Sequence, residues 1–188
     1  MALQARPLRA DAVRNRDSLL AAAKQVFGER GLDAPLEEIA RRAGVSIGTL
    51  YNHFPTREAF FDAILPERLA ALERIAATAM ADPDPWTGFT GFLEGLFALQ
   101  AEDQSLNDAL ARRLSLGEEV RASCHRGFEL AARVIERAKE SGALRADFDV
   151  QDLPLLVSAM SQVIRESTDV APQAWRRCLS FFLDGLHR

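Results

Sequence analysis

The chain has 188 residues, of which 48% are hydrophobic and 27% are charged, and its formal net charge is −4. A chain of this length can bury a sizeable core, either as one domain or as a small domain joined to a larger one. It has no apolar run near the ~18 residues that a membrane span requires, and its N-terminus lacks the apolar region of a secretory signal. We therefore expect a cytoplasmic protein without a membrane partner.

Positive charge is concentrated near the N-terminus. The first 16 residues carry four arginines against one acidic residue. Residues 1–60 hold nine basic and seven acidic residues, so the rest of the chain has a net charge of −6. We expect residues 1–10 to form a flexible basic arm. A basic region on an acidic body favours contact with phosphates and disfavours indiscriminate binding to nucleic acid.

Apolar residues at helical spacing predict a first helix over about residues 11–30, with Gly31 as its C-terminal stop. Two short helices are predicted next, over about residues 35–43 and 46–54. Between them Gly44 supplies a tight turn that favours a positive φ. Such a pair is typical of a helix-turn-helix, although an ordinary corner between two helices has the same pattern.

The second short helix is predicted to have distinct inner and outer faces. Ser46 is a suitable N-cap for it. Leu50 and Phe54 lie four residues apart and are expected to face the preceding helices. The outer face is expected to carry Gly48, Thr49, Asn52 and His53. Small and hydrogen-bonding residues on an exposed helix are what the major groove of DNA admits.

A long fourth helix is expected to begin after Thr56, its N-cap, and to reach about Met80 with a kink at Pro66. Asp84 and Pro85 are suited to start the helix after it. The later helices are expected over about residues 85–101, 105–114 with Ser105 as its cap, 115–142 with a capping box that starts at Ser115, 152–167 and 172–187. Because no strand pattern occurs, the sequence predicts an all-α fold.

A resemblance to a known family begins in the region of the short helices. The TetR family of one-component bacterial repressors has a signature similar to GVSIGTLYNHFPTREAF, and its first two helices resemble the upstream run LLAAAKQVFGERGLDAPLEEIA. This resemblance covers about residues 14–65. One subgroup, with an SbtR-like C-terminal domain, has segments similar to FALQAEDQSLNDAL, SGALRADFDVQDLPLL and AWRRCLSFFLDGL. Two positions depart from the family pattern: Ala34 replaces the usual Ser or Thr cap, and Asn52 stands where arginine is common.

The resemblance implies an N-terminal three-helix helix-turn-helix DNA-binding domain over residues 1–60. It implies a C-terminal helical domain for ligand binding and dimerisation over residues 61–188. The expected function is a homodimeric repressor that a small-molecule effector releases from a palindromic operator in double-stranded DNA. A regulator controlled by a protein partner is an alternative. An enzyme is a remote one, because the sequence shows no nucleophile with a base and no phosphate-binding glycine loop.

The candidate DNA-binding residues come from the residue pattern and from the family resemblance. Tyr51 and His53 resemble the pair that contacts the DNA backbone in the family. Arg57 lies in the first turn of the fourth helix, where free amides and a guanidinium can converge on one phosphate. Asn52 can make two hydrogen bonds to adenine. The full set expected at DNA is Ser46, Ile47, Gly48, Thr49, Tyr51, Asn52, His53, Arg57, Arg14 and Arg16.

The last two predicted helices carry apolar stripes that are wider than one face, which indicates a partner surface beyond the protein's own core. Because one helix-turn-helix reads only a few base pairs, we expect these helices to pair with a second copy. A monomer that buries both stripes in its own core is the alternative. The residues expected at the dimer interface are Leu153, Leu156, Val157, Met160, Val163, Ile164, Trp175, Leu179, Phe182 and Leu186.

Aromatic side chains with a few polar neighbours in the C-terminal part have the composition of a small-molecule pocket, although aromatic residues at helical spacing more often form plain core. The residues expected to line the pocket are Trp86, Phe89, Phe92, Phe97, Gln100, Cys124, His125, Phe128 and Met160. We expect no cofactor and no catalytic residue. No metal site is expected, because the three histidines lack the spacing of metal ligands. Cys124 and Cys178 are expected to be buried free thiols, with a redox or disulfide role as the alternative.

Overall fold

The computed structural model describes residues 5–111 and 117–188. Across these two ranges the chain forms helices and no strand, which confirms the all-α fold. The helices are α1 (Ala5–Arg30), α2 (Leu36–Ala43), α3 (Ile47–His53), α4 (Arg57–Ala81), α5 (Pro85–Glu102), α6 (Gln104–Ala111), α7 (Glu118–Glu140), α8 (Leu153–Ser167) and α9 (Ala174–Leu186), with a 3-10 turn η1 (Val150–Asp152) before α8. None of the helices within the described ranges is long and apolar enough to cross a bilayer.

Side-chain caps set the start of two long helices, as the sequence predicts. At the start of α4, the N–H of Ala59 donates to Thr56 Oγ1 over 3.2 Å. At the start of α5, the N–H of Thr87 donates to Asp84 Oδ2 over 2.9 Å. A cap of this kind contributes about 1 kcal/mol. Since α4 continues through Pro66 without interruption, one helix connects the N-terminal part of the chain to the C-terminal part.

The start of α1 differs from the prediction. This helix begins at Ala5 and not near residue 11, so residues 5–10 are helical, while the flexibility of the basic arm stays a prediction. Residues 1–4 lie outside the described part of the chain. The physical reason is local: Pro7 falls in the first helical turn, where its missing N–H is not needed, and the alanines and arginines that follow are good helix formers.

The cap of α6 also differs from the prediction. Ser105 lies inside this helix, and the cap is the carboxylate of the preceding Asp103. Asp103 Oδ1 accepts hydrogen bonds from the N–H groups of Ser105, at 2.9 Å, and Leu106, at 3.3 Å. The capping box expected at Ser115 falls outside the described residues, and α7 begins at Glu118.

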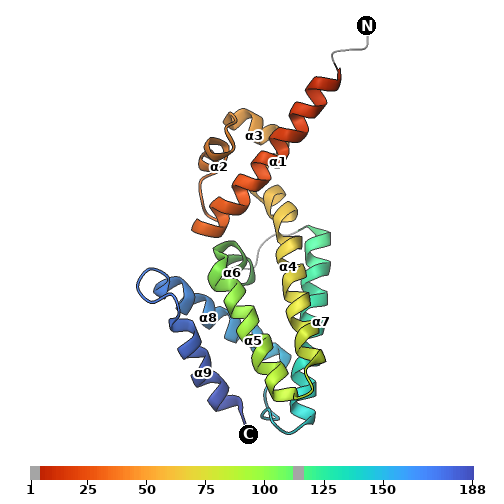
Figure 1. Cartoon of the computed structure of the whole chain (residues 1–188), viewed down its shortest axis with the longest axis vertical. Helices are drawn as coiled ribbons and strands as arrows, with labels where there is room; N and C mark the ends of the chain where they lie inside the picture. Colours follow the sequence, from red (N-terminus) through yellow and green to blue (C-terminus); the bar gives the residue numbers. More distant parts are fainter. Residues whose placement is uncertain (1–4, 112–116) are drawn as a thin grey trace.

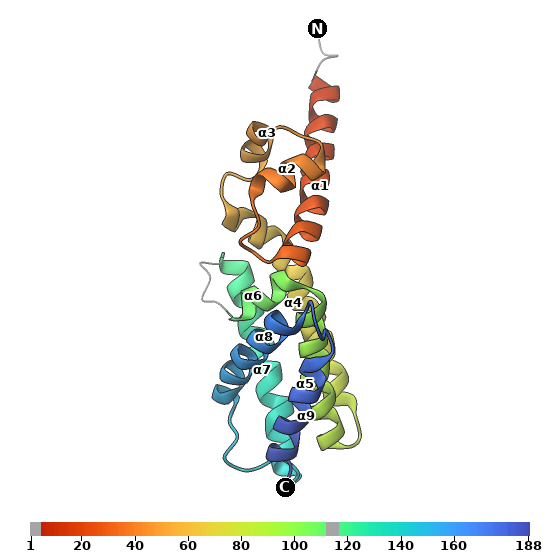
Figure 2. The same ribbon diagram turned by 90° about the vertical axis from the view of Figure 1, so that its left-hand side faces the viewer.

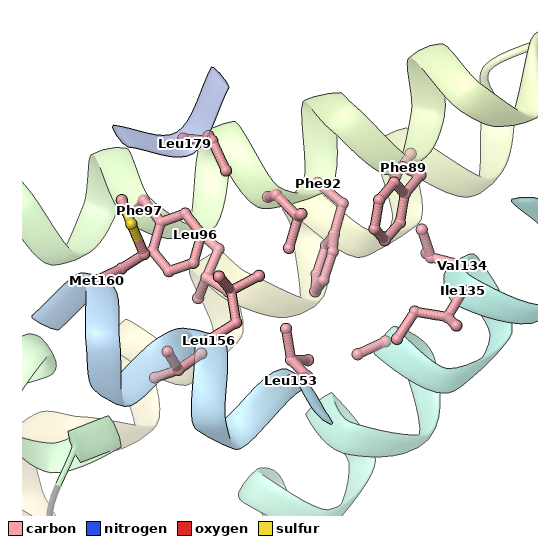
Figure 3. Packing of buried hydrophobic residues seen from close by; sticks show 14 of the residues in the cluster. Phe89, Phe92, Leu96, Phe97, Val134, Ile135, Leu153, Leu156, Met160 and Leu179 are labelled. Atoms are coloured by element: carbon pink, nitrogen blue, oxygen red, sulfur yellow. The ribbon is translucent and has the colours of Figure 1, made fainter. Parts of the chain in front are cut away.

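Buried side chains form two clusters that meet along α4, the helix that connects the N-terminal and C-terminal parts in Figure 1. The N-terminal cluster joins α1, α2 and α3 to the first half of α4, as far as Leu69, and includes Val120 of α7. The C-terminal cluster begins at Ala76 and includes α5, α7, α8 and α9. In Figure 3, Phe92 of α5 points toward Leu153 of α8 within this second cluster. The two cores therefore share α4, while the domain boundary after residue 60 stays a prediction.

Helix α6 lies between the end of α1 and the other C-terminal helices (Figures 1 and 2). Two buried aspartates, Asp103 before its first residue and Asp108 within it, bind elements on both sides. Asp103 forms an ion pair with Arg68 of α4. Asp108 Oδ2 accepts from the N–H of Leu32 over 2.9 Å, and its Oδ1 lies 3.3 Å from Arg165 of α8. Because buried carboxylates require such partners, α6 holds the N-terminal helices in a defined position.

Candidate DNA-binding surface and ligand cavity

The geometry of α2 and α3 is that of a helix-turn-helix. Gly44 has a φ of 72°, which is the left-handed conformation that the sequence predicts for the turn. The N–H of Thr49 donates to Ser46 Oγ over 3.1 Å, so Ser46 caps α3 as expected. Leu50 and Phe54 are buried in the N-terminal cluster. The ring of Phe54 also stacks on Phe60 of α4 with 4.0 Å between the ring centroids, which fixes α3 against α4.

The opposite face of α3 is open to solvent. Tyr51 is 47% exposed and Ile47 is 39% exposed, although both are large side chains. Asn52, Gly48 and Ser46 are exposed as well, whereas Thr49 and His53 are half-buried. The hydroxyls of Ser46 and Thr49 lie 2.9 Å apart, so the cap is reinforced on the outer surface. An exposed helix with these residues matches the expected shape of a major-groove reader.

One arginine of α1 lies close to this exposed helix. Arg16 is exposed, and its guanidinium stands 4.6 Å above the ring of Phe54, at the end of α3. Arg14, two residues earlier, is exposed on another side of α1 and pairs with Asp11. The structure therefore brings Arg16 next to the reading helix, where a cation can meet a phosphate.

Arg57 has a different environment from the one we expected. Its Nη1 donates to the backbone carbonyls of Leu32, at 2.6 Å, and Ala34, at 2.7 Å. Its guanidinium also lies 6.0 Å from the centroid of the Phe27 ring. Arg57 thus ties the start of α4 to the α1–α2 connection. The sequence predicts a phosphate contact for this residue, and that contact stays a prediction.

A cavity of about 440 Å³ lies among α4, α5, α6, α7 and α8. Three of the residues expected at a pocket line it: Phe92, Cys124 and Phe128. The other lining residues are Leu69, Leu72, Leu96, Ala109, Leu110, Ser123, Gly127, Ala131, Leu153, Pro154 and Val157. The sequence signal for this cavity is the run of small residues Ser123, Gly127 and Ala131, which are four apart on one face of α7. Our interpretation missed it because it followed the aromatic residues.

The remaining expected pocket residues lie elsewhere. Phe89, Phe97 and Met160 are fully buried in the C-terminal cluster. Gln100 is part of a core network, in which its Nε2 donates to Asn107 and to Ser161. Trp86 packs on His187, and His125 is exposed and lies 3.3 Å from Glu129. These positions do not line the cavity, because their helices turn them toward other neighbours.

The residues expected at a dimer interface lie mostly inside the protomer, and the interface itself stays a prediction. Seven of the ten side chains are buried within the protomer: Leu153, Leu156, Val157, Met160, Ile164, Trp175 and Leu179. The large apolar side chains that α8 and α9 leave exposed are Leu155, at 70%, Phe181, at 61%, and Phe182, at 38%. Of these only Phe182 was predicted. Helical spacing identified the apolar stripes of α8 and α9, but most of these side chains are buried by packing within the protomer, including packing on α5.

The two cysteines are unpaired and half-buried, not fully buried as expected. Burial nevertheless raises the pKa of the Cys124 thiol. Among the described residues no group of histidine, cysteine, aspartate and glutamate side chains is arranged to hold a metal ion.

Comparison with protein families assigns both parts of the chain. Residues 19–64 match the model of bacterial regulatory proteins of the TetR family, and residues 84–188 match the model of the SbtR-like transcriptional regulator C-terminal domain. The second match alone spans more than half of the chain. The chain belongs to the TetR family of transcriptional regulators.

Individual TetR-family proteins resemble it to different extents. The uncharacterised regulator YvdT of Bacillus subtilis is 36% identical over 73 residues, which is 38% of either chain. The repressor KstR2 of Mycolicibacterium smegmatis is 29% identical over 72% of this chain and 70% of its own length. The crystal structure of the TetR-family regulator SCO0520 from Streptomyces coelicolor is 30% identical, covers 92% of this chain and 98% of its own, and has a TM-score of 0.55. The protein is thus a DNA-binding transcriptional regulator.

Proposed function

We propose that this TetR-family protein is a homodimeric repressor that binds a palindromic operator and is released from it by a small-molecule effector. The observation that supports this proposal best is the arrangement along α6. One face of α6 contributes Ala109 and Leu110 to the cavity, while the neighbouring Asp108 binds the N–H of Leu32 beside the helix-turn-helix. A molecule that contacts Ala109 in the cavity therefore lies next to Asp108. The carboxylate of Asp108 is hydrogen-bonded to the segment that leads into the helix-turn-helix.

Base reading is proposed for the exposed face of α3. Ile47, Gly48 and Asn52 project from a helix whose inner face is packed firmly on α4, so their orientation is well defined. Tyr51, His53, Arg14 and Arg16 are proposed to contact the DNA backbone. These contacts position the helix, and the base contacts supply the specificity.

Two copies are needed to bind a site long enough for specific recognition. A single helix-turn-helix reads one half-site, and a twofold dimer reads two half-sites about one helical turn apart. The exposed apolar side chains Leu155, Phe181 and Phe182 of the packed helices α8 and α9 are the surface we propose for this pairing. An isologous dimer of this kind explains why a palindromic operator is expected.

Asn52→Ala is expected to relax sequence preference at one base pair of each half-site, because loss of a two-bond contact to adenine costs about 1–3 kcal/mol at that pair. Selection of bound sequences from random DNA, performed in parallel with the parent and the variant protein, measures this. Asn52 is exposed and the fold does not depend on it, so the variant remains a fair comparison. An unchanged selected motif would show that Asn52 reads no base.

Effector-dependent release is the experiment that tests the function itself. The parent protein, bound to the operator from that selection, is titrated with a metabolite library while DNA release is followed by fluorescence anisotropy. Even a tenfold loss of operator affinity needs only about 1.4 kcal/mol of differential binding. By reciprocity, operator DNA must weaken effector binding by the same factor. A tightly bound molecule with equal affinity in both states would contradict the effector mechanism and leave DNA binding intact.

A further inference from the structure

The described wall of the cavity carries no charged side chain. It is built from aliphatic and aromatic residues together with Ser123 and Cys124, which lie side by side on α7. Its volume of about 440 Å³ is within the usual range of about 300–1,000 Å³ for ligand sites. An ionised group placed in such a wall would lose its hydration without gaining a partner, which is strongly unfavourable.

The two polar groups in the wall have definite hydrogen-bonding properties. Ser123 Oγ already accepts from Nη2 of Arg126 over 2.8 Å, and Arg126 itself lies 3.3 Å from Glu73. No described residue accepts the hydroxyl hydrogen of Ser123. Burial raises the pKa of the Cys124 thiol, so this group is protonated at neutral pH and is a weak donor. The hydroxyl hydrogen of Ser123 is therefore available to a ligand, while its oxygen already accepts one of the two hydrogen bonds that a hydroxyl can take.

We infer that the effector is an uncharged, largely apolar molecule that carries a hydrogen-bond acceptor, such as a ketone, ester or ether oxygen, and places it against Ser123. This inference rests on the proposed function, because that function assigns an effector to the cavity. It specifies the chemical class that the described wall accepts, and it disfavours carboxylates, phosphates and ammonium groups in contact with that wall.

A matched pair of fluorescent probes tests the charge requirement. N-phenyl-1-naphthylamine is neutral, and 1-anilinonaphthalene-8-sulfonate has the same rings with a sulfonate added. Both are titrated into the full chain. We expect the neutral probe to bind about tenfold more tightly or better, because the sulfonate has no partner in the wall. Equal affinities at the same site would overturn the inference.

A pair of glycine variants shows whether the probe occupies the cavity. Gly127 lines the cavity, and a Cβ added there meets no atom within 4 Å, so Gly127→Leu fills the space without a clash in the backbone. Gly91 is equally open, lies on α5 and does not line the cavity, so Gly91→Leu is the matched control. Neutral-probe binding should be lost in Gly127→Leu and kept in Gly91→Leu. Binding that survives in Gly127→Leu would contradict the assignment.

The acceptor requirement is tested with 6-propionyl-2-(dimethylamino)naphthalene, a neutral probe whose ketone accepts hydrogen bonds. Ser123→Ala should weaken its binding about fivefold, the value of one hydrogen bond, and shift its emission to the blue. Binding of N-phenyl-1-naphthylamine, which has no carbonyl, should not change. Equal binding of the ketone probe to parent and variant would overturn the role of Ser123.

Failure of this inference is distinguishable from failure of the proposed function. If an anionic molecule releases the operator and Gly127→Leu abolishes its effect, the proposed function holds and the inference is wrong. If neutral probes occupy the cavity as described and no neutral molecule releases the operator, the ligand class holds and the effector mechanism fails.

Discussion

Gly31→Ala is expected to lower the free energy of unfolding by about 2–4 kcal/mol, through two effects that act together. Gly31 has a φ of +75°, a left-handed conformation that an alanine adopts only at a cost of about 1–2 kcal/mol. An added Cβ would also overlap Asp108 Oδ2, the atom that accepts from Leu32 N–H. The substitution therefore strains the turn and breaks the contact between α6 and the N-terminal helices. Urea unfolding of the full chain measures the loss.

Gly44→Ala separates the two effects. Gly44 has a φ of +72°, nearly the same as Gly31, but a Cβ added there has no atom within 4 Å. We expect the free energy of unfolding of this control variant to fall only by the conformational cost of about 1–2 kcal/mol. If Gly31→Ala and Gly44→Ala lose the same amount, the overlap with Asp108 contributes nothing and the role of α6 as a fixed connection is refuted.

Replacement of both Leu155 and Phe181 by glutamate is expected to separate the proposed dimer and to weaken operator binding by about 10²–10⁴-fold, because a monomer loses the linked second half-site. Both side chains are mainly exposed in the protomer, so the substitutions leave its core intact. Four buried carboxylates per dimer would have no partner, which makes pairing unfavourable. Light scattering gives the mass, and titration with full and half operators gives the affinity.

The control for this variant is Gly91→Glu, which adds a charge to an exposed site on α5 where an added Cβ meets no atom within 4 Å. It should keep the parent mass and operator affinity. A double variant that retains twice the protomer mass would place the dimer interface elsewhere. A parent protein that is already monomeric at the concentration used for DNA binding would refute the proposed homodimer.

The helix-turn-helix could be predicted well because its determinants are local. Ser46, which caps α3, is three residues from the amide it accepts from, and Gly44 closes a turn between adjacent helices. Leu50 and Phe54 face inward because a spacing of four places them on one side of a helix. The same locality explains the correct caps at Thr56 and Asp84.

The sites of the C-terminal part depended on contacts between distant segments. Helical spacing identified the apolar residues of α8 and α9, but it did not show which of them α5 covers and which stay exposed, such as Leu155 and Phe181. The cavity likewise combines residues from five helices.

The sequence by itself determined the all-α fold, the position of the reading helix and the family, because each follows from residues within a few turns of one another. The cavity wall, the exposed apolar face and the bond between Asp108 and Leu32 were decided only by the tertiary structure. The physical reason is that an apolar helix face gains a similar free energy of burial from any apolar neighbour. Which neighbour it receives is set by the packing of all the helices together.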